Sequence, residues 1–176
     1  MDNLKFKKIK NFLLPNEVEL LTNYSERLHR NYLALPNINL NDVGSVNDDF
    51  GLYKNHLFES LLLQKLPLME KETNLKLFPT YSYWRMYTWG SFLKKHKDRP
   101  SCEISVTVHI SGKSNNFPIF IDGEEIHTEP GDGVIYKGIE VPHWRGTLRE
   151  DFQCQVFLHY VNQNGPYKDY KYDLKQ

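Results

Sequence analysis

The sequence predicts a mainly β protein whose helices are confined to its N-terminal part. Before position 77 the apolar residues recur at helical spacing, whereas from Leu77 onward the pattern changes to a period of two. Turn residues such as Asp122-Gly123 and Pro130-Gly131 then separate short β-branched and aromatic stretches at even spacing. Many short strands after N-terminal helices indicate a jelly-roll of the double-stranded β-helix type, a cupin-like barrel.

The length and composition fit one domain. A chain of 176 residues that is 40% hydrophobic and 14% aromatic can form a substantial core. We therefore predict a single domain over residues 1–176, with a helical support over 1–76, a barrel over 77–161 and a polar tail over 162–176. The composition of the tail does not determine whether it packs on the barrel.

The charge balance and the termini narrow the range of partners. Twenty-two basic and 22 acidic residues cancel, so the chain lacks the broad positive surface of a sequence-independent nucleic-acid binder. The first residues carry mixed charge instead of a signal peptide's apolar run, and no later stretch has the length of a membrane span. Cys102 and Cys154 follow no metal or redox spacing, which fits free buried thiols. We expect a cytoplasmic protein with no membrane partner and find no support for a nucleic-acid partner.

The N-terminal part reads as one short strand followed by helices. Residues 4–12 alternate loosely and predict the strand, and residues 18–28 predict a helix. Residues 30–50 are rich in Asn and Asp and predict a long loop, either a substrate cover or disordered filler. Residues 56–75 have helical spacing interrupted by Pro67, which predicts two helical pieces.

A strand predicted around residues 81–89 places its odd-numbered side chains on one face. That face carries Tyr81, Tyr83, Arg85, Tyr87 and Trp89. Hydroxyl groups and a guanidinium suit the interior of a barrel that holds a polar ligand. Further strands are predicted over residues 103–110, 134–136, 141–145 and 152–161.

A His-x-Asp pair, His96 and Asp98, has a spacing that suits a metal ion. On a strand, residues i and i+2 point to the same face about 6–7 Å apart at Cα, so an imidazole and a carboxylate can close on one ion. His143, far downstream, is the best-placed third ligand. Two histidines and one carboxylate leave the opposite positions open, as in non-haem Fe(II) oxygenases. A surface pair with a core His143 is the plain alternative, and His127 with Glu129 is a rival pair.

Two other histidines, His109 and His159, lie in predicted strands and are expected to face inward. Their predicted role is that of core histidines whose ring nitrogens are satisfied by hydrogen bonds. We do not count them among the metal ligands.

A longer pattern surrounds the His-x-Asp pair. It reads Arg85-x-Tyr87-x-x-Gly90-x-x-Leu93-x-x-His96-x-Asp98, then Pro130-Gly131-Asp132 entering a strand, then His143. This pattern resembles the Fe(II)/2-oxoglutarate-dependent oxygenases, in particular the prolyl 4-hydroxylase-like branch, over about residues 78–160. The resemblance implies the same double-stranded β-helix, with His96, Asp98 and His143 as Fe(II) ligands. It also implies 2-oxoglutarate and O2 as co-substrates, with ascorbate as an optional addition.

The distal carboxylate of 2-oxoglutarate needs a fixed cation, ideally a bidentate arginine. In the resembled family the last barrel strand usually supplies a Lys or Arg, but the strand predicted over residues 152–161 contains neither. Arg145 shares the face of the third metal ligand and is our first candidate, with Arg149 second. An ordinary surface arginine is the alternative role for Arg145. The resemblance implies that Tyr87 assists the same carboxylate, with Arg85 along the same wall.

These observations lead to a small dioxygenase as the leading hypothesis. It would hydroxylate an unactivated carbon and release succinate and CO2, and family likeness favours a prolyl or other peptide side chain as substrate. A free amino acid, another small metabolite or an alkylated base are alternatives within the enzyme class. A non-catalytic cupin-like protein that binds a metal or ligand is the alternative outside it.

Overall fold

Two antiparallel sheets form the body of the molecule. The structure, a computed structural model, describes residues 5–33, 50–112 and 117–174. The larger sheet has the strand order β1-β8-β5-β10-β3-β2, and the smaller has the order β4-β9-β6-β7. The strands are β1 (Phe6–Ile9), β2 (Phe50–Tyr53), β3 (Leu77–Thr88), β4 (Leu93–His96), β5 (Ile104–Gly112), β6 (Ile119–Ile121), β7 (Glu124–Ile126), β8 (Gly133–Tyr136), β9 (His143–Arg145) and β10 (Phe152–Asn162).

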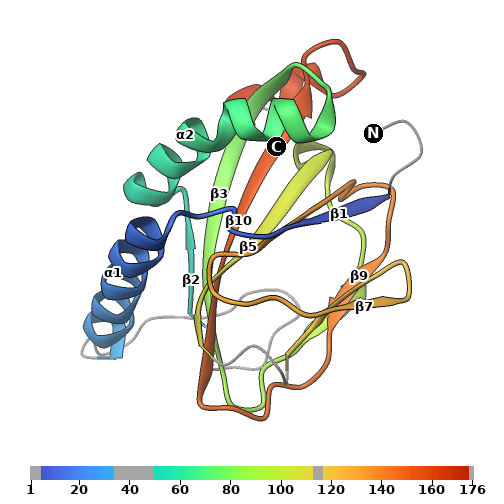
Figure 1. Cartoon of the computed structure of the whole chain (residues 1–176). Coiled ribbons are helices and arrows are strands. Elements are labelled where there is room, and N and C mark those ends of the chain that lie inside the picture. Colours follow the sequence, from blue (N-terminus) through green and yellow to red (C-terminus); the bar gives the residue numbers. More distant parts are fainter. Residues whose placement is uncertain (1–4, 34–49, 113–116, 175–176) are drawn as a thin grey trace.

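The two helices, α1 (Pro15–Leu33) and α2 (His56–Thr73), cover one side of the six-stranded sheet, and β7 and β9 of the smaller sheet lie on its other side (Figure 1). The alternation of β3 explains this layering. Trp84 and Met86 belong to the core between sheet and helices, while Tyr83 and Tyr87 pack in a separate cluster on the opposite face. The predicted period of two and the predicted interior face are therefore confirmed along β3, but the prediction was wrong for Trp89, which lies beyond the end of the strand and is 62% exposed.

The helix α2 corrects one prediction. Pro67 lies inside a single continuous helix, so the prediction of two helical pieces is wrong. A proline in a helix removes one backbone hydrogen bond and costs roughly 3 kcal/mol. Buried side chains on both sides of it, Leu62 before and Met69 after, hold the helix on the sheet and offset that cost. Asn55 caps the start by accepting a hydrogen bond from the Leu57 N–H at 3.1 Å.

The C-terminal segment packs against the barrel strands. It contains a 3-10 segment, η2 (Lys168–Asp173), which is kinked at Lys171 and Tyr172 and contacts β3 and β10. The buried Asp173 carboxylate accepts a hydrogen bond from Arg99 Nη2 at 2.8 Å and another from the Tyr53 hydroxyl. Burial alone would raise the pKa of Asp173, but these two donors hold it below its usual range.

Three further observations bear on the sequence analysis. Both cysteines are free and buried, as predicted. Residues 34–49, most of the predicted substrate cover, lie outside the described residues. Within the described part of the chain, no helix combines the length and apolar character needed to cross a membrane.

Candidate metal centre

The smaller sheet brings the three predicted metal ligands together. His96, the last residue of β4, pairs directly with His143, the first residue of β9. Asp98 follows two residues after His96, and its backbone N–H donates to the Gly138 carbonyl at 2.9 Å. Directly paired residues on adjacent strands share a face, so both imidazoles point toward the same carboxylate.

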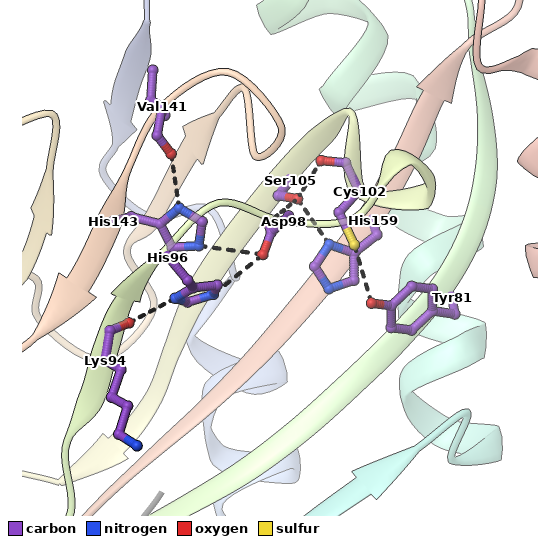
Figure 2. A network of polar contacts seen from close by, with 9 residues as sticks. All are labelled: Tyr81, Lys94, His96, Asp98, Cys102, Ser105, Val141, His143 and His159. Carbon is purple, nitrogen blue, oxygen red and sulfur yellow. Dashed lines mark hydrogen bonds and ion pairs between the residues drawn. The ribbon is translucent and has the colours of Figure 1, made fainter. Parts of the chain in front are cut away.

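The donor atoms of the three side chains converge. The Oδ1 atom of Asp98 lies 3.4 Å from His96 Nε2 and 3.3 Å from His143 Nε2. If one ligand atom is taken from each of the three residues, these atoms all lie within 4.8 Å of one another. The other ring nitrogens are fixed by carbonyl oxygens, His96 Nδ1 by Lys94 at 2.7 Å and His143 Nδ1 by Val141 at 3.1 Å (Figure 2).

These outer hydrogen bonds decide which nitrogen faces the centre. A carbonyl can only accept, so Nδ1 of each ring donates its proton to that carbonyl, and Nε2 is the nitrogen that faces Asp98 and that a metal ion would bind in place of a proton. Metal-binding histidines are oriented in this way by their outer partners. The residues present therefore fit a metal ion held by two imidazoles and one carboxylate from one side.

The electrostatics of the three side chains agree with this geometry. Burial alone would raise the pKa of the Asp98 carboxyl, but hydrogen bonds from His143 and His96 hold it well below its usual range. The Asp98 carboxylate in turn raises the pKa of His96. Gly138 makes room for the carboxylate, because a Cβ at that position would lie 2.3 Å from Asp98 Oδ2.

A cavity of about 180 Å³ opens beside the three side chains. Its wall includes Arg85 and four rings on the inner faces of β3 and β10, which are Tyr81, Tyr83, Phe157 and His159. Burial lowers the pKa of His159 to about 4, so its imidazole is neutral near pH 7. His109, by contrast, is enclosed by the carbonyls of Thr128 and Ser111, as predicted for a core histidine.

Arg145 points into the protein, on the same side of β9 as His143. It is 2% exposed, and its guanidinium donates to the Phe117 carbonyl at 2.7 Å and to the Thr107 hydroxyl at 3.4 Å. Within the described part of the chain Arg145 makes no ion pair, and its Nε has no hydrogen-bond partner. Burial lowers its pKa, but an arginine stays charged. A buried guanidinium without a carboxylate is costly unless an anion binds there.

More buried polar atoms without partners lie on the neighbouring strands. Gln153 is fully buried next to Tyr87 in the sheet register, and among the described residues both atoms of its amide lack a partner. Gln155 accepts from the Thr107 hydroxyl at 3.1 Å, but its Nε2 has no partner in the part of the chain that the structure describes. Buried polar groups are normally satisfied, so such a group of exceptions suggests a site for a polar ligand.

The structure places some of the predicted residues away from the cavity and brings one unexpected residue to it. Arg149 is exposed, with its guanidinium 5.7 Å from the Trp89 ring, which places the second candidate anchor outside the cavity. His127 pairs with Glu125 at 3.0 Å, so the rival pair does not form a centre with His143. His159 was predicted to be a core histidine, but in the structure its side chain also lines the cavity. Alternation along β10 from Gln153 was the signal that could have identified it.

Comparisons with known proteins agree with this architecture. No protein-family model and no curated protein matches the sequence. A prolyl-4-hydroxylase from Pseudomonas putida matches with a TM-score of 0.62 and 19% identity, over 90% of this chain and 94% of that chain. A viral collagen prolyl hydroxylase from Paramecium Bursaria Chlorella virus-1, in a 2-oxoglutarate complex, matches with a TM-score of 0.64 and 11% identity, over 90% and 97%.

The chain has the jelly-roll fold of the 2-oxoglutarate/Fe(II) oxygenases. Another such match is EctD from S. alaskensis with bound Fe, at a TM-score of 0.66 and 12% identity, over 90% of this chain and 73% of that chain. The predicted mainly β fold with N-terminal helices is therefore confirmed, and the three converging side chains lie in the barrel of this fold.

Proposed function

We propose that the chain is an Fe(II)/2-oxoglutarate-dependent dioxygenase that hydroxylates an unactivated carbon. The observation that carries this proposal is the convergence of His96, Asp98 and His143, with both Nε2 atoms turned toward one carboxylate oxygen. Fe(II) held on one side by two histidines and a carboxylate leaves coordination positions for a 2-oxo acid and for O2. The matched structures include proteins named as prolyl hydroxylases and one with bound Fe, which supports the same chemistry.

The chain's own residues have three tasks in this scheme. His96, Asp98 and His143 hold the metal, and the carbonyls of Lys94 and Val141 keep both imidazoles in the tautomer that can bind it. When bound, Fe(II) would supply the oxidation with O2 as the oxidant, one oxygen atom entering the substrate and the other the succinate that forms from 2-oxoglutarate with release of CO2. The cavity beside the metal admits the carbon that is hydroxylated.

Arg145 is proposed as the cation that meets the distal carboxylate of 2-oxoglutarate. It is buried, makes no ion pair in the described part of the chain and lies on the same strand as His143. The Tyr87 hydroxyl and the amides of Gln153 and Gln155 supply neutral hydrogen-bonding groups in the same region. A guanidinium on β9 would then replace the cation expected on β10. Arg85, on the cavity wall, is a further contact for the co-substrate.

The primary substrate of the proposed reaction is a peptide side chain or a small metabolite. Likeness to proteins named as prolyl hydroxylases makes a prolyl side chain the first candidate on family grounds. The proposed reaction requires O2. Ascorbate is an optional addition to an assay of this activity.

Anaerobic absorption spectroscopy tests the proposal. Fe(II) followed by 2-oxoglutarate should produce a metal-to-ligand charge-transfer band in the visible range. His96→Ala should abolish the band, while the same substitution at His127, which pairs with Glu125 on the surface, should leave it unchanged. A wild-type protein that binds Fe(II) but gives no band with 2-oxoglutarate would show a binding protein without this chemistry.

A further inference from the structure

The cavity wall formed by the rings of Tyr81, Tyr83, Phe157 and His159 differs from the region around Arg145. We call these four residues the aromatic wall. Phe157 is paired with Tyr83 across β10 and β3, and the centroids of Tyr81 and His159 are 4.5 Å apart. The rings of Phe157 and His159 are nearly parallel, at 4°. Such a wall suits a small, flat or cyclic apolar unit next to the metal.

The hydrogen bonds of Ser105 determine what His159 offers to that unit. The Ser105 hydroxyl lies 2.8 Å from His159 Nδ1, 3.1 Å from the Cys102 carbonyl and 3.5 Å from Asp98 Oδ2 (Figure 2). The hydroxyl has one hydrogen, and both the carbonyl and the carboxylate can only accept. Donation of this hydrogen to the Cys102 carbonyl, the nearer of the two, leaves the hydroxyl oxygen free to accept the proton of His159 Nδ1, and we take this tautomer as the one that meets a ligand.

This arrangement leaves Nε2 of His159 as a hydrogen-bond acceptor. Within the described residues, that atom has no hydrogen-bond partner, and His159 lies on the cavity wall. The other hydroxyl at this end of the wall is already engaged, because the Tyr81 Oη atom lies 3.0 Å from Cys102 Sγ. Nε2 of His159 is thus the acceptor that this end of the wall presents to an incoming molecule.

We propose that the aromatic wall is the subsite for the primary substrate, and that His159 Nε2 accepts a hydrogen bond from an N–H or O–H group of that substrate. The inference rests on the proposed function and narrows its substrate class, away from the prolyl side chain that family likeness favours. A prolyl residue inside a peptide is a tertiary amide whose ring carries no such donor. The wall instead selects a small cyclic or flat unit that carries its own donor, such as a secondary amide or a hydroxylated ring.

Two matched probes separate these possibilities. 2-Pyrrolidinone and N-methyl-2-pyrrolidinone are neutral five-membered rings that differ in one N–H donor, and the second mimics a tertiary prolyl amide. Ligand-observed NMR titrations of the metal-free chain measure both affinities without any dependence on iron or 2-oxoglutarate. We expect 2-pyrrolidinone to bind about three- to tenfold more tightly, the range for one hydrogen bond in a protein.

Variants assign the preference to the imidazole. His159→Phe keeps a ring on the wall but removes the acceptor, so the preference should fall below about twofold. His127→Phe, the same change at an exposed surface histidine, should retain it. Circular dichroism and thermal unfolding check that both variants fold.

Equal binding of the two probes to the wild type, or a preference that survives in His159→Phe, would overturn the donor assignment. Absence of binding by both probes would overturn the subsite itself. Failure of the proposed function is separate, because it appears as a missing charge-transfer band with Fe(II) and 2-oxoglutarate whatever the probes do.

Discussion

Replacing Arg145 by glutamine should weaken the binding of 2-oxoglutarate without harming the fold. The guanidinium is buried and donates to the Phe117 carbonyl and the Thr107 hydroxyl, neither of which carries a charge. A structural arginine would normally be paired with a carboxylate, and its loss would destabilise the protein by several kcal/mol. Arg145 makes no such pair within the described part of the chain.

The magnitude follows from the hydrogen bonds that a guanidinium makes to a carboxylate. Each such charged bond contributes about 1.5–3 kcal/mol, so the loss of two raises the dissociation constant of 2-oxoglutarate by at least about a hundredfold. The metal-free protein, meanwhile, loses an uncompensated buried charge. Its free energy of unfolding should therefore stay within about 1 kcal/mol of the wild type or increase.

Two measurements on the same variant check this reasoning. The affinity comes from an anaerobic titration of the Fe(II)–2-oxoglutarate absorption band, and the stability from urea unfolding of the metal-free chain. Arg149→Gln, the same change at an exposed arginine near Trp89, is the matched control and should alter neither value. An unchanged affinity in Arg145→Gln would refute the assignment, and a large loss of stability would show that Arg145 is structural.

Relocating the charge adds a stricter test. Gln153 is fully buried on β10, the strand that usually supplies this cation in the resembled family, and its amide has no partner among the described residues. Gln153→Arg in the Arg145→Gln background should recover part of the lost affinity, because it returns a guanidinium to the same interior. No recovery in a folded double variant would indicate that the two positions do not serve one carboxylate.

Three further predictions concern stability, metal affinity and the C-terminal segment. Burial lowers the pKa of His109 to about 4. Between about pH 6.5 and 4 the unfolded chain therefore binds a proton at this histidine that the folded chain does not. The free energy of unfolding should fall as the pH falls through this range, by on the order of 3 kcal/mol. His109→Gln should flatten this dependence in urea unfolding at pH 7 and pH 4.5, and an unchanged slope would contradict it. Gly138→Ala should lower Fe(II) affinity about tenfold or more by displacing the Asp98 carboxylate. Gly146→Ala is the control and should leave the affinity unchanged, because its Cβ would meet none of the described residues within 4 Å. Asp173→Asn should destabilise the chain by about 1–2 kcal/mol and speed proteolysis of η2, and an unchanged cleavage rate would show that this carboxylate does not hold the segment.

The sequence was most informative where a short period or a fixed spacing carries the signal. The alternation along β3 predicted which side chains face the barrel interior, and the structure confirms it. The spacing of His96 and Asp98 selected two of the converging side chains. It could not show that His143 pairs directly with His96, because that contact depends on how two distant strands are aligned.

Features set by long-range packing were beyond sequence reasoning. Pro67 predicted a helix break, but contacts on both sides of it keep α2 continuous. The sequence predicted a core histidine at position 159, but the cavity that His159 lines is formed by strands distant in the sequence. The packing of the C-terminal tail on the barrel could not be predicted from its own sequence. Asp173, which holds the tail in place, contacts residues far away in the sequence, among them Arg99.

The most direct test of the account is the position of the metal itself. Crystals soaked anaerobically with Fe(II), measured at the iron absorption edge, should show an anomalous peak in contact with Nε2 of His96, Nε2 of His143 and a carboxylate oxygen of Asp98. A peak beside Cys102 and His159, which form a second candidate cluster with Asp98, would contradict the account. So would a fourth protein ligand that closes the coordination sphere.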